Sequence, residues 1–331
     1  MTLAREVLLD QAAGQCLLST PASMALDARR LGGPELKFKA ASVARLSATG
    51  VRLIARATAK SAASQYCAVF GHEGAGDQAG LCGLVSEVWL SRMRTAAFGT
   101  VIVERLVNPG PLVVALCGAG AIAAEIVPML AHSLPIKELR VHTRRTESMS
   151  AFVAAHAKAV PFTVRAEADC ARAAQGADLV ITLTRALEPF IFPGMLKPGA
   201  VVCSMGNDNE IDHGVLGEAK RLIVDDADFA AEAGDGAAWI AQGRMTRGEF
   251  EARIDALACD VVAGGKPGRL AESDRIIALA QGMASGDIAF AAHVLRQAKK
   301  SGRGRSIELP PAGSALQNVR IPESGPHDTE P

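Results

Sequence analysis

The feature that most constrains the fold of this chain is a short apolar run that ends in closely spaced glycines. Residues 113–117 read Val-Val-Ala-Leu-Cys, and Gly118-Ala119-Gly120 follow directly. A continuous apolar run of this length, bounded by glycine, is typical of a strand buried on both faces of a parallel sheet. From Ala121 to about Ser133, apolar residues recur at helical spacing. We therefore expect a buried strand, a tight turn and a helix in this order.

Gly118, Gly120 and Ala123 form a Gly-x-Gly-x-x-Ala turn, which is typical of Rossmann-type dinucleotide-binding domains when it lies between a strand and a helix. The first glycine permits the tight turn, and the second lets the backbone approach a pyrophosphate. Alanine keeps the helix close to the strand, and the helix N-terminus favours the phosphate charge. We assign five positions to the cofactor: Gly118, Ala119, Gly120, Ala121 and Ile122. The alternative is a ligand-free turn rich in alanine and glycine.

The chain beyond Pro111 alternates between apolar runs and helical patterns. Strands are expected at 112–116, 138–142, 161–164, 179–182, 200–204 and 221–224, with helices ending near 133 and 160 and a last helix over 286–299. Alternation of this kind predicts an α/β fold, a Rossmann-type doubly wound parallel sheet. The tail from Pro310 is rich in proline, glycine and charge and is expected to be loose.

The first third of the chain reads as a second, mixed α+β domain. After a helical start come apolar stretches at 51–55 and 66–70, and the turn chemistry of 71–77 predicts a hairpin. A helix is expected over 88–106, where Asn108-Pro109-Gly110-Pro111 stops it. We place residues 110–286 in the dinucleotide-binding domain, and 1–109 with 287–331 in a substrate-binding and dimerisation domain.

Charge and cysteine content exclude several classes of protein. Lysine and arginine together number 35, as do aspartate and glutamate, so the chain has no excess of basic residues. We therefore expect neither nucleic acid nor an anionic membrane as a partner. No apolar run reaches the roughly 20 residues of a membrane span. The seven cysteines are scattered without CxxC pairs, which favours reduced thiols in the cytoplasm. The seven histidines show no metal-ligand spacing, so no metal site is expected.

Cofactor preference depends on the end of the second strand, where a carboxylate would accept from the ribose of NAD. This chain has no carboxylate there; it has Thr143, Arg144 and Arg145 instead. These side chains favour the 2′-phosphate of NADP, with NAD as the other possibility. The alternative is that both arginines are a solvated strand exit. We also assign Thr182, Met205, Gly206 and Met283 to the cofactor site.

Four segments together resemble the ornithine cyclodeaminase and mu-crystallin family. They are Arg94-Thr95-Ala96-Ala97 in the predicted helix, the glycine-rich turn, Ser204-Met205-Gly206-Asn207-Asp208, and Gly282-Met283-Ala284-Ser285-Gly286-Asp287. The likeness covers most of the chain from about Gly50 to Leu309. It implies a homodimer, in which the N-terminal segment and the last helix form one domain around a central dinucleotide-binding domain.

The resemblance also implies roles for single residues. Arg94 and Arg52 would hold a substrate carboxylate, with Lys37 near a further basic position of the family. A planar guanidinium suits this role because it grips a carboxylate through two parallel hydrogen bonds. The alternative for Arg94 is a surface cation, and the neighbouring Arg92 competes for the role.

Asp208 matches the family's catalytic acid, and it follows a strand, where doubly wound sheets place their ligands. There it would accept a proton from the substrate nitrogen or stabilise a cationic iminium. The alternative is a loop aspartate that caps the next helix. Many members follow this aspartate with Pro-Gly-Lys, whereas this chain has Asn209-Glu210-Ile211-Asp212, so its loop is shorter. The segment between Lys37 and Arg52 also looks shorter than usual.

Three functions fit these expectations. The first is an NAD(P)H-dependent reductase of small imino acids (ketimines), which in reverse is an amino acid dehydrogenase. The second is a cyclodeaminase, a lyase that returns the hydride to the same cofactor. The NADP-like strand end leans toward reduction, because a recycling lyase has no need of the reducing pool. The third is a non-catalytic dinucleotide-binding protein, which the altered Asp208 loop keeps open.

Overall fold

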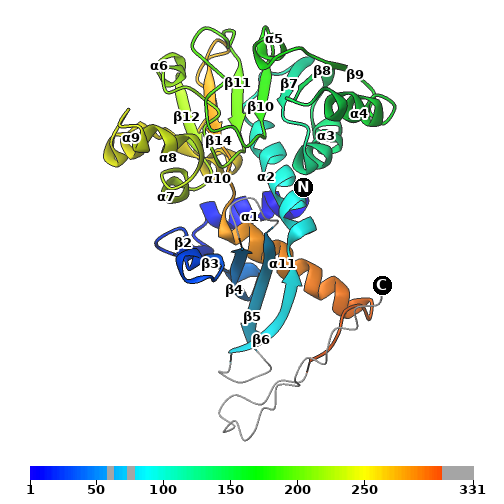
Figure 1. Cartoon of the computed structure of the whole chain (residues 1–331), viewed down its shortest axis with the longest axis vertical. Coiled ribbons are helices and arrows are strands. Elements are labelled where there is room, and N and C mark those ends of the chain that lie inside the picture. The colour runs from blue at the N-terminus through cyan, green and yellow to red at the C-terminus, as the bar shows by residue number, and fades with distance from the viewer. Residues whose placement is uncertain (58–62, 73–78, 308–331) are drawn as a thin grey trace, which may run out of the picture.

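A computed structural model describes residues 1–57, 63–72 and 79–307. Its first part is a helix, a set of antiparallel strands and a second long helix (Figure 1). The elements are α1 (Thr2–Ala12), β1 (Cys16–Leu18), β2 (Met24–Asp27), η1 (Arg29–Leu31), β3 (Glu35–Val43), η2 (Ala44–Leu46), β4 (Ala48–Arg56), β5 (Ser64–His72), β6 (Ala79–Ser86) and α2 (Val88–Val103).

These strands form a six-stranded antiparallel sheet in the order β1-β3-β4-β5-β6, with β2 also paired to β3. Alternation along the strands turns one set of side chains toward α11 (Ala284–Lys300), which packs against β3, β4 and β5. Ala41, Val43 and Cys67 belong to this buried set, and so do two basic residues, Lys39 and Arg52. The covered face of the sheet therefore carries positive charge into the interior.

The second part of the chain contains the parallel strands and their helices. They are β7 (Leu112–Cys117), α3 (Ala121–Ser133), β8 (Ile136–His142), α4 (Thr146–His156), β9 (Thr163–Ala166), α5 (Cys170–Ala174), β10 (Leu179–Thr182), β11 (Val201–Ser204), α6 (Val215–Glu218), β12 (Arg221–Val224), α7 (Ala227–Ala230), α8 (Gly234–Ala241), α9 (Arg247–Arg253), β13 (Ala256–Leu257), α10 (Ala258–Val262) and β14 (Ile276–Leu279).

These strands form an eight-stranded sheet in the order β13-β12-β14-β11-β10-β7-β8-β9, and every pairing is parallel. The chain winds outward from β7 to β9, then returns to β10 on the other side of β7. The sheet is therefore doubly wound, with its switch point between β7 and β10, and ligands bind at the carboxyl ends of the strands beside such a point. The predicted fold class is confirmed.

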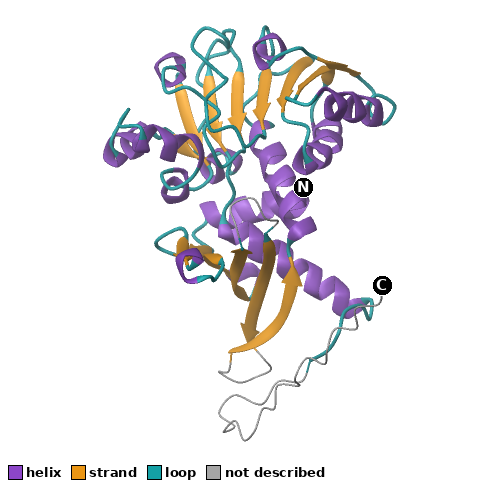
Figure 2. Cartoon of the chain, viewed as in Figure 1, coloured by secondary structure: helices purple, strands orange, loops and turns teal. Residues whose placement is uncertain are grey.

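Alternate residues of β7 belong to two different cores. Leu112, Val114 and Leu116 pack with residues of α2 and α3, whereas Val113 and Ala115 pack with α5, α6 and α8 on the other face. Burial on both faces explains why the run is continuously apolar. Helices α1, α2 and α11 lie between the two sheets, which Figure 2 shows as orange strands above and below them.

Most predicted elements are found within a few residues of their expected bounds. Two strands of the parallel sheet were not predicted: β14, which lies between β11 and β12, and the two-residue β13 at the edge. In the antiparallel sheet, β1, β2 and β3 were not predicted individually. The expected hairpin is the antiparallel pair β5 and β6, while its turn at 73–78 and the tail from Pro310 lie outside the described residues. The predicted domain division stays a prediction; the strands of the two sheets fall on either side of residue 109. Within the described ranges, no helix is long and apolar enough to cross a membrane.

Candidate active site

A cavity of about 630 Å³ opens at the carboxyl ends of β7, β8 and β10, beside the switch point of the parallel sheet. It is lined by Gly118, His142, Thr143, Arg144, Cys170, Thr184, Arg185, Ala186, Leu187, Glu188 and Phe190. The lining includes the first glycine of the predicted turn and two of the three residues predicted to bind a 2′-phosphate. We call this space the dinucleotide cavity.

The glycine-rich turn at this cavity has the geometry that a dinucleotide needs. Gly118 has φ +114°, and a Cβ there would lie 2.5 Å from the carbonyl oxygen of Leu183. Gly120 is the N-cap of α3 and gives it no side-chain cap, and a Cβ there would meet nothing within 4 Å. The first amides of this 13-residue helix thus have open space before them, which suits a phosphate group.

The other residues predicted at the turn and the strand end are placed unevenly. Ala119 and Ile122 are half-buried, whereas Ala121 is exposed in the first turn of α3. Thr143 and Arg144 line the dinucleotide cavity, but Arg145 does not. Arg145 is instead the exposed N-cap residue of α4. The structure therefore brings one of the two predicted arginines to the cavity.

Four further predicted cofactor contacts do not line the dinucleotide cavity, because all are buried in the interior. The Thr182 hydroxyl donates to Glu210 Oε2 at 2.7 Å, and a Cβ on Gly206 would lie 2.5 Å from that same oxygen. Met205 packs against Gly99 of α2, and Met283 is the N-cap residue of α11. These four residues therefore belong to the packed interior of the protein.

Asp208 lies in the loop after β11 and is half-buried. No hydrogen bond or ion pair engages its carboxylate within the part of the chain that the structure describes. The next helix, α6, has Gly214 at its N-cap and no side-chain cap, so the helix-capping alternative for Asp208 is wrong. The loop itself is held by the Asn209 N–H, which donates to the Ala186 carbonyl at 3.0 Å. Among the described residues, nothing prevents the Asp208 carboxylate from contacting a ligand.

Two buried acids, to which the sequence analysis assigned no role, hold this loop through hydrogen bonds. Glu210 accepts hydrogen bonds from Thr182, from Ser204 and from both the amide and the hydroxyl of Thr184, which ties together the ends of β10 and β11. Asp235 Oδ1 accepts from the amides of Glu210 and the following residue, at 2.6 and 2.7 Å. Burial raises the pKa of Asp235 to about 7. The short loop is thus anchored by carboxylates.

A second group of charged residues lies where the two sheets approach each other. We call it the Gly282 cluster; its members besides Gly282 are Lys39, Arg52, Glu87, Arg94, Asp225 and Asp287. All are less than a tenth exposed. They come from β3, β4, α2 and its N-cap, the residue after β12, and the first turn of α11. Buried charges persist only when they are paired, or when a ligand completes them.

Arg94 lies at the centre of this cluster and is 4 % exposed, so the surface-cation alternative is wrong. Its Nε lies 2.7 Å from Asp287 Oδ1. The angle of this contact makes it an ion pair and not a well-aligned hydrogen bond, and Nη1 has no hydrogen-bond acceptor among the described residues. A Cβ on Gly282 would lie 1.8 Å from Nη1, so only glycine permits this close approach. The N–H groups of Arg94 Nη1 are therefore buried donors available to a bound anion.

Arg52 is buried too, but its donors are already engaged. Its Nε donates to Glu87 Oε2 at 2.5 Å, and its Nη2 donates to Gln65 Oε1 and Ser91 Oγ. Its Nη1 lies 3.7 Å from Asp287 Oδ2. The structure thus makes Arg52 a support for the cluster, and Arg94 has the freer guanidinium for a substrate carboxylate.

The structure brings Lys39, not Lys37, to this cluster. Lys39 Nζ donates to the Gly282 carbonyl at 3.2 Å and lies 2.9 Å from the centroid of the Phe229 ring. Lys39 is paired in register with Arg52 of the cluster. The half-exposed Lys37 is paired with Ile54, which is not part of the cluster. Both lysines are on one face of the strand, so alternation alone does not separate them. The predicted role of Lys37 is corrected accordingly.

Burial shifts the pKa values of the cluster toward neutrality. It lowers the pKa of Lys39 to about 7 and raises the pKa of Asp225 to about 6. Burial, reinforced by the charge of Asp287, raises the pKa of Glu87 to about 7. Asp287 is different, because burial opposes its charge but Arg52 and Arg94 hold its pKa below the usual range. Titratable groups near neutrality, gathered beside an anion-binding arginine, are typical of catalytic sites.

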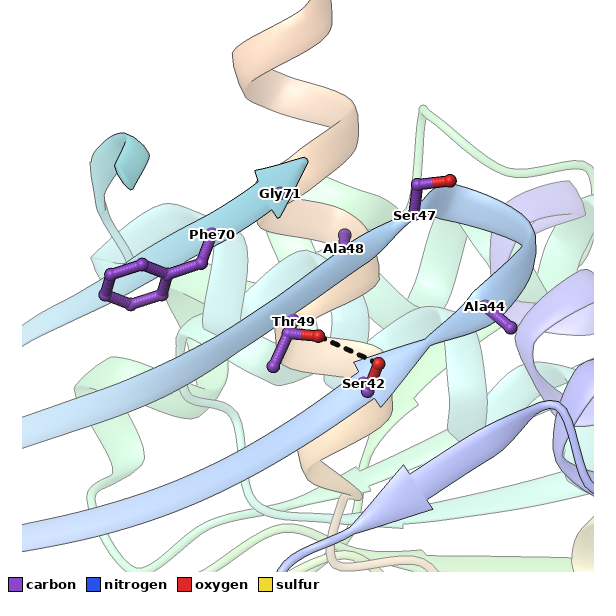
Figure 3. Close-up of a pocket in the computed structure, with 7 residues that line it drawn as sticks. All are labelled: Ser42, Ala44, Ser47, Ala48, Thr49, Phe70 and Gly71. Carbon is purple, nitrogen blue, oxygen red and sulfur yellow. Dashed lines mark hydrogen bonds between the residues drawn. The ribbon is translucent and has the colours of Figure 1, made fainter. Parts of the chain in front are cut away.

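A smaller cavity of about 240 Å³ lies at the turn between β3 and β4 (Figure 3). It is lined by Ser42, Ala44, Ser47, Ala48, Thr49, Phe70 and Gly71, and the Thr49 hydroxyl donates to that of Ser42 at 2.9 Å. No charged side chain lines it, so it lacks what a carboxylate substrate needs. Among the described residues, no group of three or more histidines, cysteines and carboxylates is placed to hold a metal.

Comparison with known proteins identifies the family of the chain. The family model that matches residues 40–302 is that of the ornithine cyclodeaminase/mu-crystallin family. A protein of Rhizobium meliloti (strain 1021) named as a dehydrogenase is 32% identical over 229 residues, 68% of each chain. The ketimine reductase mu-crystallin of Mus musculus is 32% identical over 151 residues, which is 44% of this chain and 47% of that protein.

Two solved structures share the fold. The Δ1-pyrroline-2-carboxylate reductase of Thermococcus litoralis, in complex with NADH and L-proline, has a TM-score of 0.79 at 18% identity and covers 92% of this chain and 94% of its own. An archaeal alanine dehydrogenase dimer with bound NAD has a TM-score of 0.79 at 18% identity, with 93% of both chains covered. Both match the two-sheet architecture over nearly its whole length.

Proposed function

The chain belongs to the ornithine cyclodeaminase/mu-crystallin family, and we propose that it is an NAD(P)H-dependent reductase of small imino acids, or amino acid dehydrogenase in reverse. Relatives by sequence include the mouse ketimine reductase and the Δ1-pyrroline-2-carboxylate/Δ1-piperideine-2-carboxylate reductase of Azospirillum brasilense, which is 35% identical over 149 residues. The observation that carries the proposal is Arg94: its buried Nη1 has no hydrogen-bond acceptor among the described residues, while its Nε is ion-paired to Asp287.

The dinucleotide cavity fits the cofactor by its glycine turn and by the open N-terminus of α3. Gly118, Gly120 and the first amides of α3 would hold the pyrophosphate, and Thr143 and Arg144 would meet the adenosine ribose. Arg144 beside Thr143, with no carboxylate at the strand end, supports a preference for NADP over NAD. When bound, the reduced nicotinamide supplies a hydride, and the protein contributes positioning and electrostatics.

The Gly282 cluster binds the other reactant in this proposal. Arg94 grips the substrate carboxylate with the donors that the protein leaves free, and Asp287 keeps the guanidinium in place. Asp208, in the loop that contains Glu210, has no hydrogen-bond or ion-pair partner among the described residues, and we assign its carboxylate to stabilise a cationic iminium. Fixing the carboxylate fixes the α-carbon and its nitrogen as well, which lowers the entropic cost of reaction.

We also propose that the chain acts as a homodimer through the outer face of its six-stranded sheet. Tyr66, Phe70 and Leu84 alternate with buried residues on β5 and β6, and they are 38%, 38% and 62% exposed on the face opposite α11. Trp89, at the start of α2, is 57% exposed. An exposed apolar sheet face of this kind is typical of a subunit interface, and a protein of the same fold is a dimer.

The test is oxidation of NADPH and of NADH by the purified protein with a panel of cyclic ketimines and of imines formed from 2-oxo acids with ammonia. Net oxidation is the expected result, faster with NADPH. Release of ammonia from ornithine or a related diamino acid without net oxidation would instead identify a cyclodeaminase. If neither reaction occurs while the nucleotide binds, either the substrate assignment is wrong or the protein is a non-catalytic dinucleotide-binding protein.

A further inference from the structure

Three side chains of the Gly282 cluster converge on one residue. The Gly282 carbonyl accepts from Lys39 Nζ at 3.2 Å, and the Gly282 amide donates to Asp225 Oδ2 at 2.6 Å. Arg94 lies against the Cα of the same glycine, where a Cβ would be 1.8 Å from Nη1. A lysine, an aspartate and the anion-binding arginine are thus held side by side by the backbone between β14 and α11.

The ammonium of Lys39 is enclosed by this arrangement. Charged groups face it from every element packed around it: Arg52 on β4, Arg94 on α2, Asp287 on α11, and Asp225 and Asp226 after β12. The Phe229 ring of α7 covers it from the other side. Within the described residues the ammonium donates one hydrogen bond, to Gly282. An ammonium has three donors, so others remain for a ligand held on Arg94.

The position of the imine nitrogen follows from the position of the carboxylate. In an α-imino acid the nitrogen and the carboxylate carbon are bonded to the same carbon atom. A carboxylate held by Arg94 therefore keeps the nitrogen close to the residues that flank Arg94. Lys39 is the cationic proton donor that the structure places there, because an arginine does not give up its proton. The carboxylates of Glu87 and Asp225 accept hydrogen bonds, from Arg52 and from the Gly282 amide.

We propose that Lys39 is the catalytic acid that protonates the imine nitrogen, and that Asp225 is a positioning residue that acts on Lys39 through Gly282. This inference rests on the proposed reductase function and assigns the source of the proton within it. Asp208 is left to stabilise the positive charge that results.

The proton step is balanced by the groups on hand. An N–H bond of the Lys39 ammonium breaks, its electron pair stays on Nζ, and the proton bonds to the lone pair of the imine nitrogen. Lys39 becomes a neutral amine and the substrate a cationic iminium. In the dehydrogenase direction, neutral Lys39 takes the proton back. Burial, which lowers the pKa of Lys39 to about 7, brings the acid close to the working pH, where general acid catalysis is most efficient.

The experiment compares Lys39→Met, Lys39→Arg and the control Lys37→Met, which removes an exposed lysine from the same face of the same strand. The substrate is a cyclic ketimine, so that no free amine is needed to form it. We expect kcat to fall by about 10²–10⁴-fold in both Lys39 variants and to stay at the wild-type level in the control. Added ethylamine should restore part of the activity of Lys39→Met.

The conservative variant decides between a proton donor and a fixed charge. Arginine keeps the positive charge but does not release its proton, so a Lys39→Arg protein with nearly wild-type kcat would overturn the proposal. A Lys39→Met protein with raised KM and unchanged kcat would also overturn it and would make Lys39 a carboxylate anchor. Binding of NADPH, followed by fluorescence, shows whether each variant is folded. Failure of the wild type to oxidise NADPH or NADH would instead refute the proposed function.

Asp225→Asn tests the positioning role through the pH profile of kcat, which a merely structural role would leave unchanged. Asparagine still accepts the Gly282 N–H, but it removes the negative charge that raises the pKa of Lys39. In the reductive direction kcat falls as pH rises and Lys39 loses its proton. We therefore expect this alkaline limb to move to lower pH in Asp225→Asn and to vanish from the profile of Lys39→Arg. An alkaline limb at the wild-type pH in both variants would contradict the assignment.

Discussion

The dinucleotide cavity and the Gly282 cluster differ in what the chain uses to build them. The cavity depends on backbone: a glycine at φ +114° and the uncapped terminus of α3, contributed by residues close together in the sequence. The cluster depends on side chains from β3, β4, α2, α11 and the residue after β12, which meet only in the folded molecule. In the proposed function, the cavity holds phosphate near solvent, whereas the cluster holds a carboxylate among buried charges.

This difference means that the two sites should fail separately. A change in the cavity should weaken nucleotide binding and leave the charged cluster intact. A change in the cluster should abolish turnover and cost stability, because a buried charge that loses its partner is penalised, while nucleotide binding persists.

The largest effect is expected from Arg94→Gln. The variant removes the carboxylate anchor and leaves Asp287 without the guanidinium that lies 2.7 Å from it. We expect the free energy of unfolding to fall by about 3–5 kcal/mol. Loss of charge-assisted hydrogen bonds to the substrate should lower kcat/KM by at least about 100-fold. Chemical denaturation and steady-state kinetics measure the two losses.

Arg92→Gln is the matched control, since Arg92 is half-buried in the same helix and has no place in the cluster. It should change unfolding free energy and kcat/KM little. The Kd of NADPH should stay within about twofold of wild type in both variants. Loss of NADPH binding in folded Arg94→Gln would contradict the separation of the two sites.

Gly118→Ala is expected to have the next largest effect, this time in the cavity. Its Cβ would lie 2.5 Å from the Leu183 carbonyl oxygen in a backbone conformation that favours glycine, so the turn must shift. The strain is of the order of 1–3 kcal/mol. We expect lower thermal stability together with a weakened affinity for NADPH, measured by thermal unfolding and by titration of nucleotide fluorescence.

Gly120→Ala separates the fold from the ligand at the same turn. Gly120 has φ −89° and open space around its Cβ position, so alanine should leave the unfolding temperature unchanged. The added methyl group would still crowd a pyrophosphate at the helix terminus, so the affinity for NADPH should fall. Unchanged NADPH affinity would show that the phosphate binds elsewhere.

The contrast between the sites also explains what could be predicted from the sequence. Strands β7, β8, β10, β11 and β12 were predicted because each is a bounded apolar run in a βα alternation. β14 (Ile276–Leu279) is also a bounded apolar run, but only a five-residue helix, α10, precedes it, so the βα alternation that indicated the other strands is weak there. The glycine turn was predicted because its chemistry is local, as a backbone-built site requires.

Side-chain sites depend on tertiary depth, which periodicity does not give. Lys37 and Lys39 are on one face of β3, and only the packing of α11 and Phe229 shows that Lys39 is the buried one. Glu87 and Asp225 carried no signal in the sequence, because each becomes notable only through a partner far along the chain. The resemblance led to Arg94 but did not show that Arg52 is committed to Glu87.

Glu87→Gln should produce a smaller, pH-dependent effect in the cluster. Burial raises the pKa of Glu87 from 4.5 to about 7, so the folded state binds a proton that the unfolded state has released. Stability from this source is complete below about pH 4.5 and is lost as pH rises through 7. Between these values we expect wild type to lose roughly 2–3 kcal/mol more than Glu87→Gln, measured by denaturation at several pH values.

Glu251→Gln is the control for that measurement, because Glu251 forms an exposed ion pair with Arg247 in α9. Exposed pairs contribute little to stability, so its pH dependence should match that of wild type. If the unfolding free energy of Glu87→Gln depends on pH as steeply as that of wild type, Glu87 does not bind a proton in this range. It would then remain charged, and its raised pKa would be wrong.

The smallest effects are expected at the rim of the dinucleotide cavity, where solvent screens charge. Arg144 lines the cavity and is exposed, so Arg144→Ala should weaken NADPH binding by about tenfold and leave NADH binding nearly unchanged. Arg145 is the N-cap residue of α4 and does not line the cavity, so Arg145→Ala should change either Kd by less than about twofold. Titration with both nucleotides measures the preference directly. Equal losses for NADPH and NADH in Arg144→Ala would mean that the arginine meets the pyrophosphate or the adenine, and the preference for NADP would then have no support at this strand end.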